Sequence, residues 1–159
     1  MIPDCYVAAL RILKFRFNSE AELRRKLRAK KFEKDDIDAT IARLHREKWL
    51  DDERFAGAFV RTRSNKRVGQ LRIRRELQAA GVDNETAKQA LTNNVDVEKE
   101  AEGLRALCAR RIRMLVRRHG ESYLDSEEAY AKLTSYLVSH GYDFALVREV
   151  VRDARKRPE

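Results

Sequence analysis

The segment RIRRELQAAGVDNETAKQAL, residues 72–91, decides the fold because it matches another part of the chain without a gap. Laid over ELRRKLRAKKFEKDDIDATI, residues 22–41, it places apolar residues at matching positions: Leu23 with Ile73, Leu27 with Leu77, Phe32 with Val82, Ile37 with Ala87, and Ile41 with Leu91. A third copy, KLTSYLVSHGYDFALVREVV, follows at residues 132–151. Recurrence of this kind is typical of helical repeat proteins, so the sequence predicts three tandem units.

Apolar residues within the copies recur three and four positions apart, which is the period of a helix that buries one face. Ser19 and Glu22 form a capping-box pattern, and Asp51 stands where it caps a further helix. The first helix is expected to group Tyr6, Leu10, Leu13 and Phe17 on one face. We predict an all-α protein of tandem three-helix repeats in an elongated, curved, right-angled or solenoid-like array, with repeats at 1–50, 51–94 and 95–159.

The turn between the two helices of each copy is predicted to hold a left-handed residue. Gly81 and Gly141 occupy this position in the second and third copies, and glycine adopts a positive φ without steric cost. The first copy has Lys31 there, which costs some stability but is tolerated.

The bulk composition favours a polyanionic partner. Lys and Arg number 35 against 26 Asp and Glu, a net charge of +9, which suits nucleic acid, an acidic membrane or an acidic protein face. Cys5 and Cys108 lie far apart, so they indicate neither a disulfide framework nor a zinc site. No apolar run is long enough to span a membrane, and the N-terminus lacks a signal-peptide pattern. These features predict a cytoplasmic protein.

No nucleophile, base and orienting residue can be assembled from this sequence. We therefore expect a protein that is not an enzyme and has no catalytic residues, no cofactor and no metal site.

Three basic segments without acidic residues recur in step with the repeats. Residues 61–75 contain seven Lys and Arg, residues 24–31 contain six, and residues 110–118 contain five. We expect these clusters to align along one side and to bind a polyanion in a salt-sensitive way. The candidate contacts, in order of preference, are Arg61, Arg63, Lys66, Arg67, Arg72 and Arg75, then Arg24, Arg25 and Arg28, then Arg110, Arg111, Arg113, Arg117 and Arg118.

Residues 49–91 resemble the RecX family, bacterial modulators of the RecA recombinase. The resemblance rests on Leu50-Asp51-Asp52, Phe55-Ala56, the basic run to Gly69, Arg72-Ile73, Glu76-Leu77 and Gly81-Val82. The stretch SEAELRRKL, residues 19–27, is similar to the family's first-repeat helix. One departure is Arg67-Val68-Gly69-Gln70, where the family often has Gly, an aromatic residue, Gly and Pro.

This resemblance implies tandem three-helix repeats and a regulatory function in DNA repair and the SOS response. Family members bind RecA along the groove of the RecA–DNA filament and typically suppress its ATPase, coprotease and strand-exchange activities. For this chain the resemblance implies the RecA filament as partner. We also expect weaker electrostatic binding to single- and double-stranded DNA, no membrane association and a monomeric state.

Two other functions fit the residues. A stand-alone helical DNA-binding regulator is the main alternative, although that class expects one recognition helix and a dimer on two half-sites, whereas the charge here is spread over three units. A helical scaffold for an acidic protein is the second alternative, and insensitivity to nucleic acid would favour it.

Overall fold

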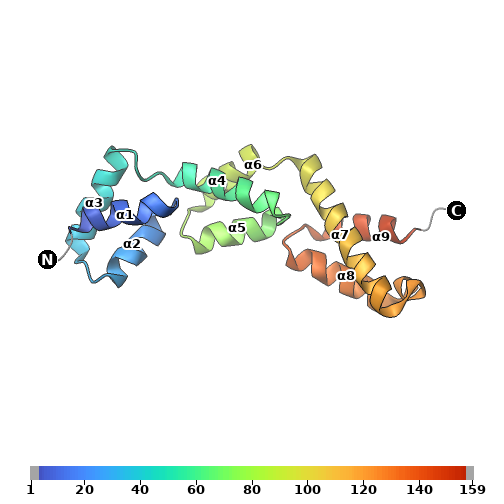
Figure 1. Cartoon of the computed structure of the whole chain (residues 1–159). Helices are drawn as coiled ribbons and strands as arrows, with labels where there is room; N and C mark the ends of the chain where they lie inside the picture. The colour runs from blue at the N-terminus through green and yellow to red at the C-terminus, as the bar shows by residue number, and fades with distance from the viewer. Residues whose placement is uncertain (1–3, 157–159) are drawn as a thin grey trace. The chain divides into compact units, whose positions relative to one another are not determined.

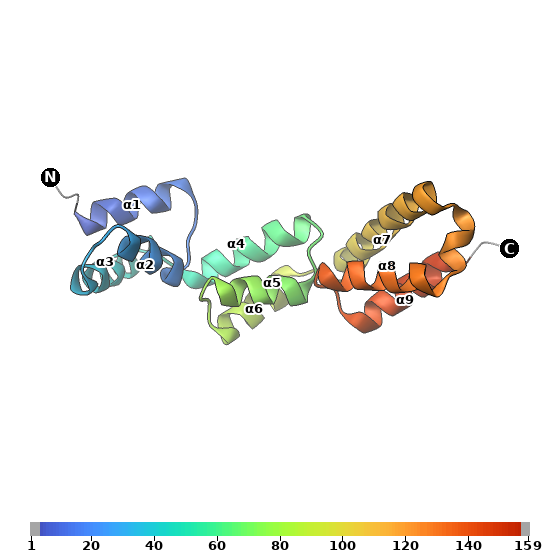
Figure 2. The same cartoon turned by 90° about the horizontal axis from the view of Figure 1, so that it is seen from below.

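The computed structural model describes residues 4–156, and every regular element in that range is a helix (Figures 1 and 2). The elements are α1 (Cys5–Phe15), α2 (Glu20–Ala29), α3 (Lys34–Arg46), α4 (Asp52–Asn65), α5 (Gln70–Ala79), α6 (Asn84–Asn94), α7 (Val97–His119), the 3-10 helix η1 (Glu121–Asp125), α8 (Glu127–Ser139) and α9 (Phe144–Arg155). The predicted all-α class is confirmed.

Three copies of a helix pair follow the periodicity of the sequence. The pairs are α2 with α3, α5 with α6, and α8 with α9, and each has a further helix before it. The aligned apolar positions are buried in all three copies, except that Phe32 is half-buried. The residues at the first two aligned positions are fully buried: Leu23, Leu27, Ile73, Leu77, Leu133 and Leu137.

The left-handed turn residue is present in every copy. Gly81 has a φ of 82°, Gly141 of 91°, and Lys31 of 68°. The prediction that Lys31 takes the glycine conformation is therefore confirmed. Two more non-glycine residues, Lys48 and Arg67, adopt a positive φ of 57°.

The chain divides into two compact units, each built from two separate stretches. The first comprises Met1–Phe59 and Glu76–Asn93, and the second comprises Val60–Arg75 and Asn94–Glu159. Both units thus contain part of the second repeat. The predicted repeat boundaries stay a prediction.

The first unit buries one core between α1, α2 and α3. α1 contributes small side chains, which lets α2 and α3 approach it closely. The buried residues of this cluster are Cys5, Ala8, Ala9, Leu23, Leu27, Ile37, Ile41, Leu44 and Leu50. Phe17 was predicted on the inner face of the first helix, and this is wrong. α1 ends at Phe15, and the Phe17 side chain is 54% exposed.

The second unit has its core where α7 packs across α8 and α9 (Figure 1). Tyr142 is its largest buried side chain, and Cys108 lies fully buried among the apolar residues. Burial raises the pKa of the Cys108 thiol to about 11. The thiol is therefore protonated at neutral pH, which fits a packing role.

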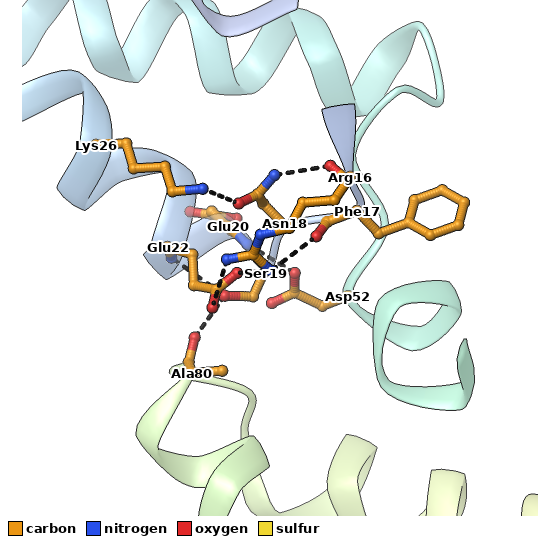
Figure 3. A network of polar contacts seen from close by, with 9 residues as sticks. All are labelled: Arg16, Phe17, Asn18, Ser19, Glu20, Glu22, Lys26, Asp52 and Ala80. Atoms are coloured by element: carbon orange, nitrogen blue, oxygen red, sulfur yellow. Dashed lines mark hydrogen bonds and ion pairs between the residues drawn. The ribbon is translucent and has the colours of Figure 1, made fainter. Parts of the chain in front are cut away.

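The start of α2 is held by residues that come much later in the chain (Figure 3). The Ser19 hydroxyl accepts the Glu22 N–H at 3.1 Å, as the capping pattern predicts, and also donates to the Ala80 carbonyl. Asp52 accepts the Glu20 N–H at 2.8 Å. A carboxylate at the start of the next repeat therefore satisfies a backbone N–H that this helix leaves without an intrahelical partner.

The start of α5 is held in the same way within the second unit. The Gly69 N–H donates to the His140 carbonyl at 2.8 Å, and the Leu71 N–H donates to the Gly141 carbonyl at 3.0 Å. Glu100, near the start of α7, accepts the Gln70 N–H at 3.1 Å. The same arrangement thus occurs twice. In both cases the start of a helix is hydrogen-bonded to the turn of the following repeat and to a carboxylate of that repeat.

Candidate nucleic-acid and partner interface

The first-choice basic residues all belong to one backbone stretch of the second unit. Residues 61–75 cover the end of α4, the α4–α5 turn and the first part of α5. Arg63 and Arg72 are half-buried, and Arg74, which the prediction left out, is exposed. The exposed cations of this stretch are Arg61, Lys66, Arg67, Arg74 and Arg75.

The α4–α5 turn carries these cations on a closely packed backbone. Arg67 adopts its left-handed conformation here, and Gly69 is buried two residues later. A Cβ at Gly69 would lie 2.3 Å from the carbonyl carbon of Gly141, so no larger residue fits without a backbone shift. The backbone that carries these cations is therefore fixed by packing, which lowers the backbone part of the entropy cost of binding a partner.

The residue at position 70 has a structural consequence in this turn. Gln70 stands where the family that the sequence resembles is expected to have proline, and both its backbone N–H and its side-chain amide donate to Glu100. Proline has no backbone N–H and cannot make the first of these bonds. At position 70 this chain therefore has, in place of a rigid proline, a glutamine that is hydrogen-bonded to Glu100 on α7.

A cavity of about 280 Å³ lies beside this stretch, between the end of α4 and the start of α7. Arg61 and Asn94 both line it, and the Arg61 guanidinium donates to the Asn94 side-chain oxygen at 2.6 Å. Tyr142 lines the cavity, and burial together with the Glu100 charge raises its pKa to about 12. Its hydroxyl is therefore protonated at neutral pH and does not serve as a base there.

The second-choice residues lie on α2 in the first unit. Arg24 is half-buried, donates to Glu20 at 2.7 Å and forms an ion pair with Asp38. Its charge is therefore largely compensated within the unit. Arg25 and Arg28 are exposed, and they are the two members of this set whose position fits a contact with a partner.

The third-choice residues lie on the C-terminal half of α7. Arg111 is half-buried, with its guanidinium 4.7 Å from the centre of the Tyr136 ring. The exposed members are Arg110, Arg113, Arg117 and Arg118. Within the second unit, this half of α7 runs away from the α4–α5 turn in both views (Figures 1 and 2). The unit therefore carries two separate basic regions.

Across residues 4–156, no group of three or more His, Cys, Asp or Glu residues is arranged to hold a metal ion. In the same part of the chain, every helix is too short or too polar to cross a membrane.

Sequence reasoning missed an aromatic groove in the first unit. The groove has a volume of about 360 Å³ and is lined by Leu13, Phe17, Glu47, Lys48, Trp49 and Arg54. We call these six residues the aromatic groove. Phe17 was assigned to the core because its spacing continues the apolar stripe of α1. The available signal was the Ser19 cap, which starts a new helix only two residues after Phe17 and so ends the first one before it.

Comparison with protein-family models matches the first two of the three repeats. Residues 5–44 match the first three-helix domain of RecX, and residues 51–91 match the second three-helix domain of RecX. The chain belongs to the RecX family.

Curated relatives extend this likeness beyond the two matched domains. The regulatory protein RecX of Salmonella typhimurium is 35% identical over 156 residues, which covers 91% of this chain and 88% of that protein. The regulatory protein RecX of Serratia proteamaculans is 32% identical over 172 residues, covering 94% of this chain and 97% of the relative.

A solved RecX structure shares the fold. The crystal structure of RecX from Lactobacillus salivarius aligns with a TM-score of 0.78 at 25% sequence identity. The alignment covers 96% of this chain and 95% of that one. Tandem three-helix repeats, predicted from periodicity, are thus confirmed by the family models and by a solved relative.

Proposed function

We propose that this chain binds RecA and the RecA–DNA filament and lowers the ATPase, strand-exchange and coprotease activities of RecA. Membership of the RecX family supports a regulatory function that acts through binding. The observation that carries the proposal in this chain is the stretch 61–75, which has five exposed cations and no acidic residue. Such a stretch attracts DNA phosphates and acidic protein surfaces.

The position of this stretch supports a contact function. Its cations lie around a turn whose backbone is bonded to His140 and Gly141, so the backbone that carries them is fixed before any partner arrives. The Glu100 carboxylate, which lies beside this stretch, already accepts from Gln70. Five cations of the stretch are exposed and accessible to a partner.

The proposed mechanism is stabilisation of one filament state. RecA cycles between nucleotide states as it hydrolyses ATP, and a protein that contacts neighbouring subunits and the DNA between them favours the state to which it binds best. ATP hydrolysis then slows, because the regulator must dissociate from the RecA subunits before they can pass to the next nucleotide state. Bridging needs no catalytic group in the regulator.

The test is the DNA-dependent ATPase of RecA on single-stranded DNA, titrated with this protein up to saturation. We expect the steady-state rate to fall as the protein approaches a fixed ratio to RecA, and to recover partly as salt rises, because phosphate contacts weaken. An unchanged rate at saturating protein in both low and moderate salt contradicts the proposal. A footprint on one duplex sequence that persists without RecA would instead identify a stand-alone DNA-binding regulator.

A further inference from the structure

The aromatic groove exposes two large aromatic side chains on one face of the first unit. Phe17 is 54% exposed and Trp49 is 55% exposed. Both line the same cavity, which also contains Lys48 and Arg54. Exposed apolar area of this kind, bordered by polar residues, is typical of a binding site.

Local hydrogen bonds hold the backbone at both rings. Trp49 follows a left-handed Lys48, and its N–H donates to the Leu44 carbonyl at 2.9 Å. Next to Phe17, the Asn18 amide donates to the Arg16 carbonyl at 2.8 Å. Figure 3 shows the Phe17 ring pointing away from this polar network. The two aromatic residues are thus positioned before a ligand binds, which reduces the entropy cost of binding.

The charge around the groove is positive. Arg54 places its guanidinium 5.3 Å from the centre of the Phe17 ring and donates to the Lys48 carbonyl at 3.2 Å. The one acidic lining residue, Glu47, accepts from the Tyr6 hydroxyl and pairs with Arg43 at 2.8 Å. Hydrogen bonds from those two partners lower the pKa of Glu47, and the Arg43 guanidinium compensates its charge.

We propose that the aromatic groove binds single-stranded nucleic acid by stacking a base on Phe17 and Trp49, with Lys48 and Arg54 contacting the neighbouring phosphates. Aromatic side chains combined with cations are the elements that bind unpaired bases, because every base offers a π-face and every nucleotide a negative charge. An apolar peptide would use the rings but not the two cations. A duplex would use the cations, but its bases are already stacked.

This inference deepens the proposed function, because it names single-stranded DNA as a ligand of a site separate from residues 61–75. The two remain distinguishable, since groove binding is measured without RecA. A protein that binds single strands through the groove but leaves RecA unaffected would contradict only the proposed function. A protein that inhibits RecA but does not bind single strands through the groove would contradict only the proposal for the groove.

Trp49 gives the groove its own signal because it is the only tryptophan in the chain. The full chain is titrated with oligodeoxythymidylate and, separately, with an abasic oligomer of equal length and charge. We expect the oligodeoxythymidylate to quench Trp49 emission strongly and the abasic oligomer to leave it nearly unchanged, because stacking requires bases. Equal quenching by the two oligomers, or none by the first, overturns the proposal.

Phe17→Ala tests the second ring, and Phe144→Ala is its matched control. Phe144 is 52% exposed and also lies under an arginine, with the Arg148 guanidinium 5.9 Å from the ring centre. Phe17→Ala is expected to weaken oligodeoxythymidylate binding by roughly 5- to 100-fold, the usual effect of removing one stacking aromatic residue. Phe144→Ala is expected to leave it unchanged. Circular dichroism checks that both variants fold.

The salt dependence separates stacking from charge. Because Phe17 carries no charge, the slope of log affinity against log salt is expected to be the same for Phe17→Ala and the parent, and duplex affinity is expected to be unchanged. The proposal is overturned if Phe17→Ala and Phe144→Ala lose the same affinity for oligodeoxythymidylate. It is also overturned if Phe17→Ala loses the same affinity for single-stranded and duplex DNA. Quenching by an acidic peptide as strong as that by the oligomer would identify a peptide-binding groove instead.

Discussion

Gly141→Ala is expected to lower the free energy of unfolding by roughly 2 to 5 kcal/mol, combining left-handed strain with overpacking. The strain arises because Gly141 has a φ of 91°. The overpacking arises because an added Cβ would lie 2.2 Å from the Arg72 Cβ and 2.6 Å from the Arg72 backbone nitrogen. Urea unfolding followed by circular dichroism measures the loss.

Gly120→Ala is the matched control for this substitution. Gly120 also has a positive φ, 87°, but nothing lies within 4 Å of the position its Cβ would take. It therefore bears backbone strain without crowding, and its loss of stability is expected to be the smaller of the two. Equal losses would mean that the close approach between α5 and the α8–α9 turn contributes nothing to stability.

The double variant Lys66→Glu, Arg75→Glu is expected to weaken binding to the RecA–DNA filament by about 10-fold or more. Both residues are exposed in the stretch 61–75, so the substitutions alter charge without disturbing a buried contact. The slope of log affinity against log salt is expected to fall in magnitude by about 1.4, the contribution of two single-strand phosphate contacts. Inhibition of the RecA ATPase should need correspondingly more protein.

Arg117→Glu, Arg118→Glu carries the same change in charge on another surface of the second unit. Both residues are exposed near the end of α7, away from the α4–α5 turn. If the stretch 61–75 is the contact, this control should bind the filament more tightly than the first variant. Equal weakening of the two variants would mean that net charge alone governs binding.

The repeat positions could be predicted because they depend on local periodicity. Leu23, Ile73 and Leu133 align in the sequence and are all fully buried in the structure. The turn residue followed from the same alignment, which is why Lys31 could be assigned a left-handed conformation that its residue type does not favour. Periodicity fixes which face of a helix is buried, and that is enough to specify the repeat.

The contacts that hold the starts of α2 and α5 could not be predicted, because they connect residues far apart in the sequence. The Asp52 carboxylate, in the first turn of α4, accepts the N–H of Glu20 on another helix. Glu100 does the same for Gln70. Local propensity does not report which backbone group a side chain meets after folding.

The candidate interface could be predicted only in part for the same reason. The basic stretches are visible in the sequence, but the ion pair of Arg24 with Asp38 depends on how α2 and α3 pack. The aromatic groove was hidden because Phe17 continues the spacing of α1 although the helix ends at Phe15. Because Phe17 lies beyond the end of α1, the helical spacing no longer determines which way its side chain points, and it lies on the surface.

Co-sedimentation with preformed filaments tests the central claim, that this chain recognises RecA assembled on DNA. RecA filaments on single-stranded DNA are pelleted with increasing amounts of the protein at moderate salt, in parallel with the same DNA without RecA and with RecA without DNA. We predict saturable pelleting with the filament and much weaker association with either component alone. Pelleting that tracks the DNA and is indifferent to RecA would contradict the account.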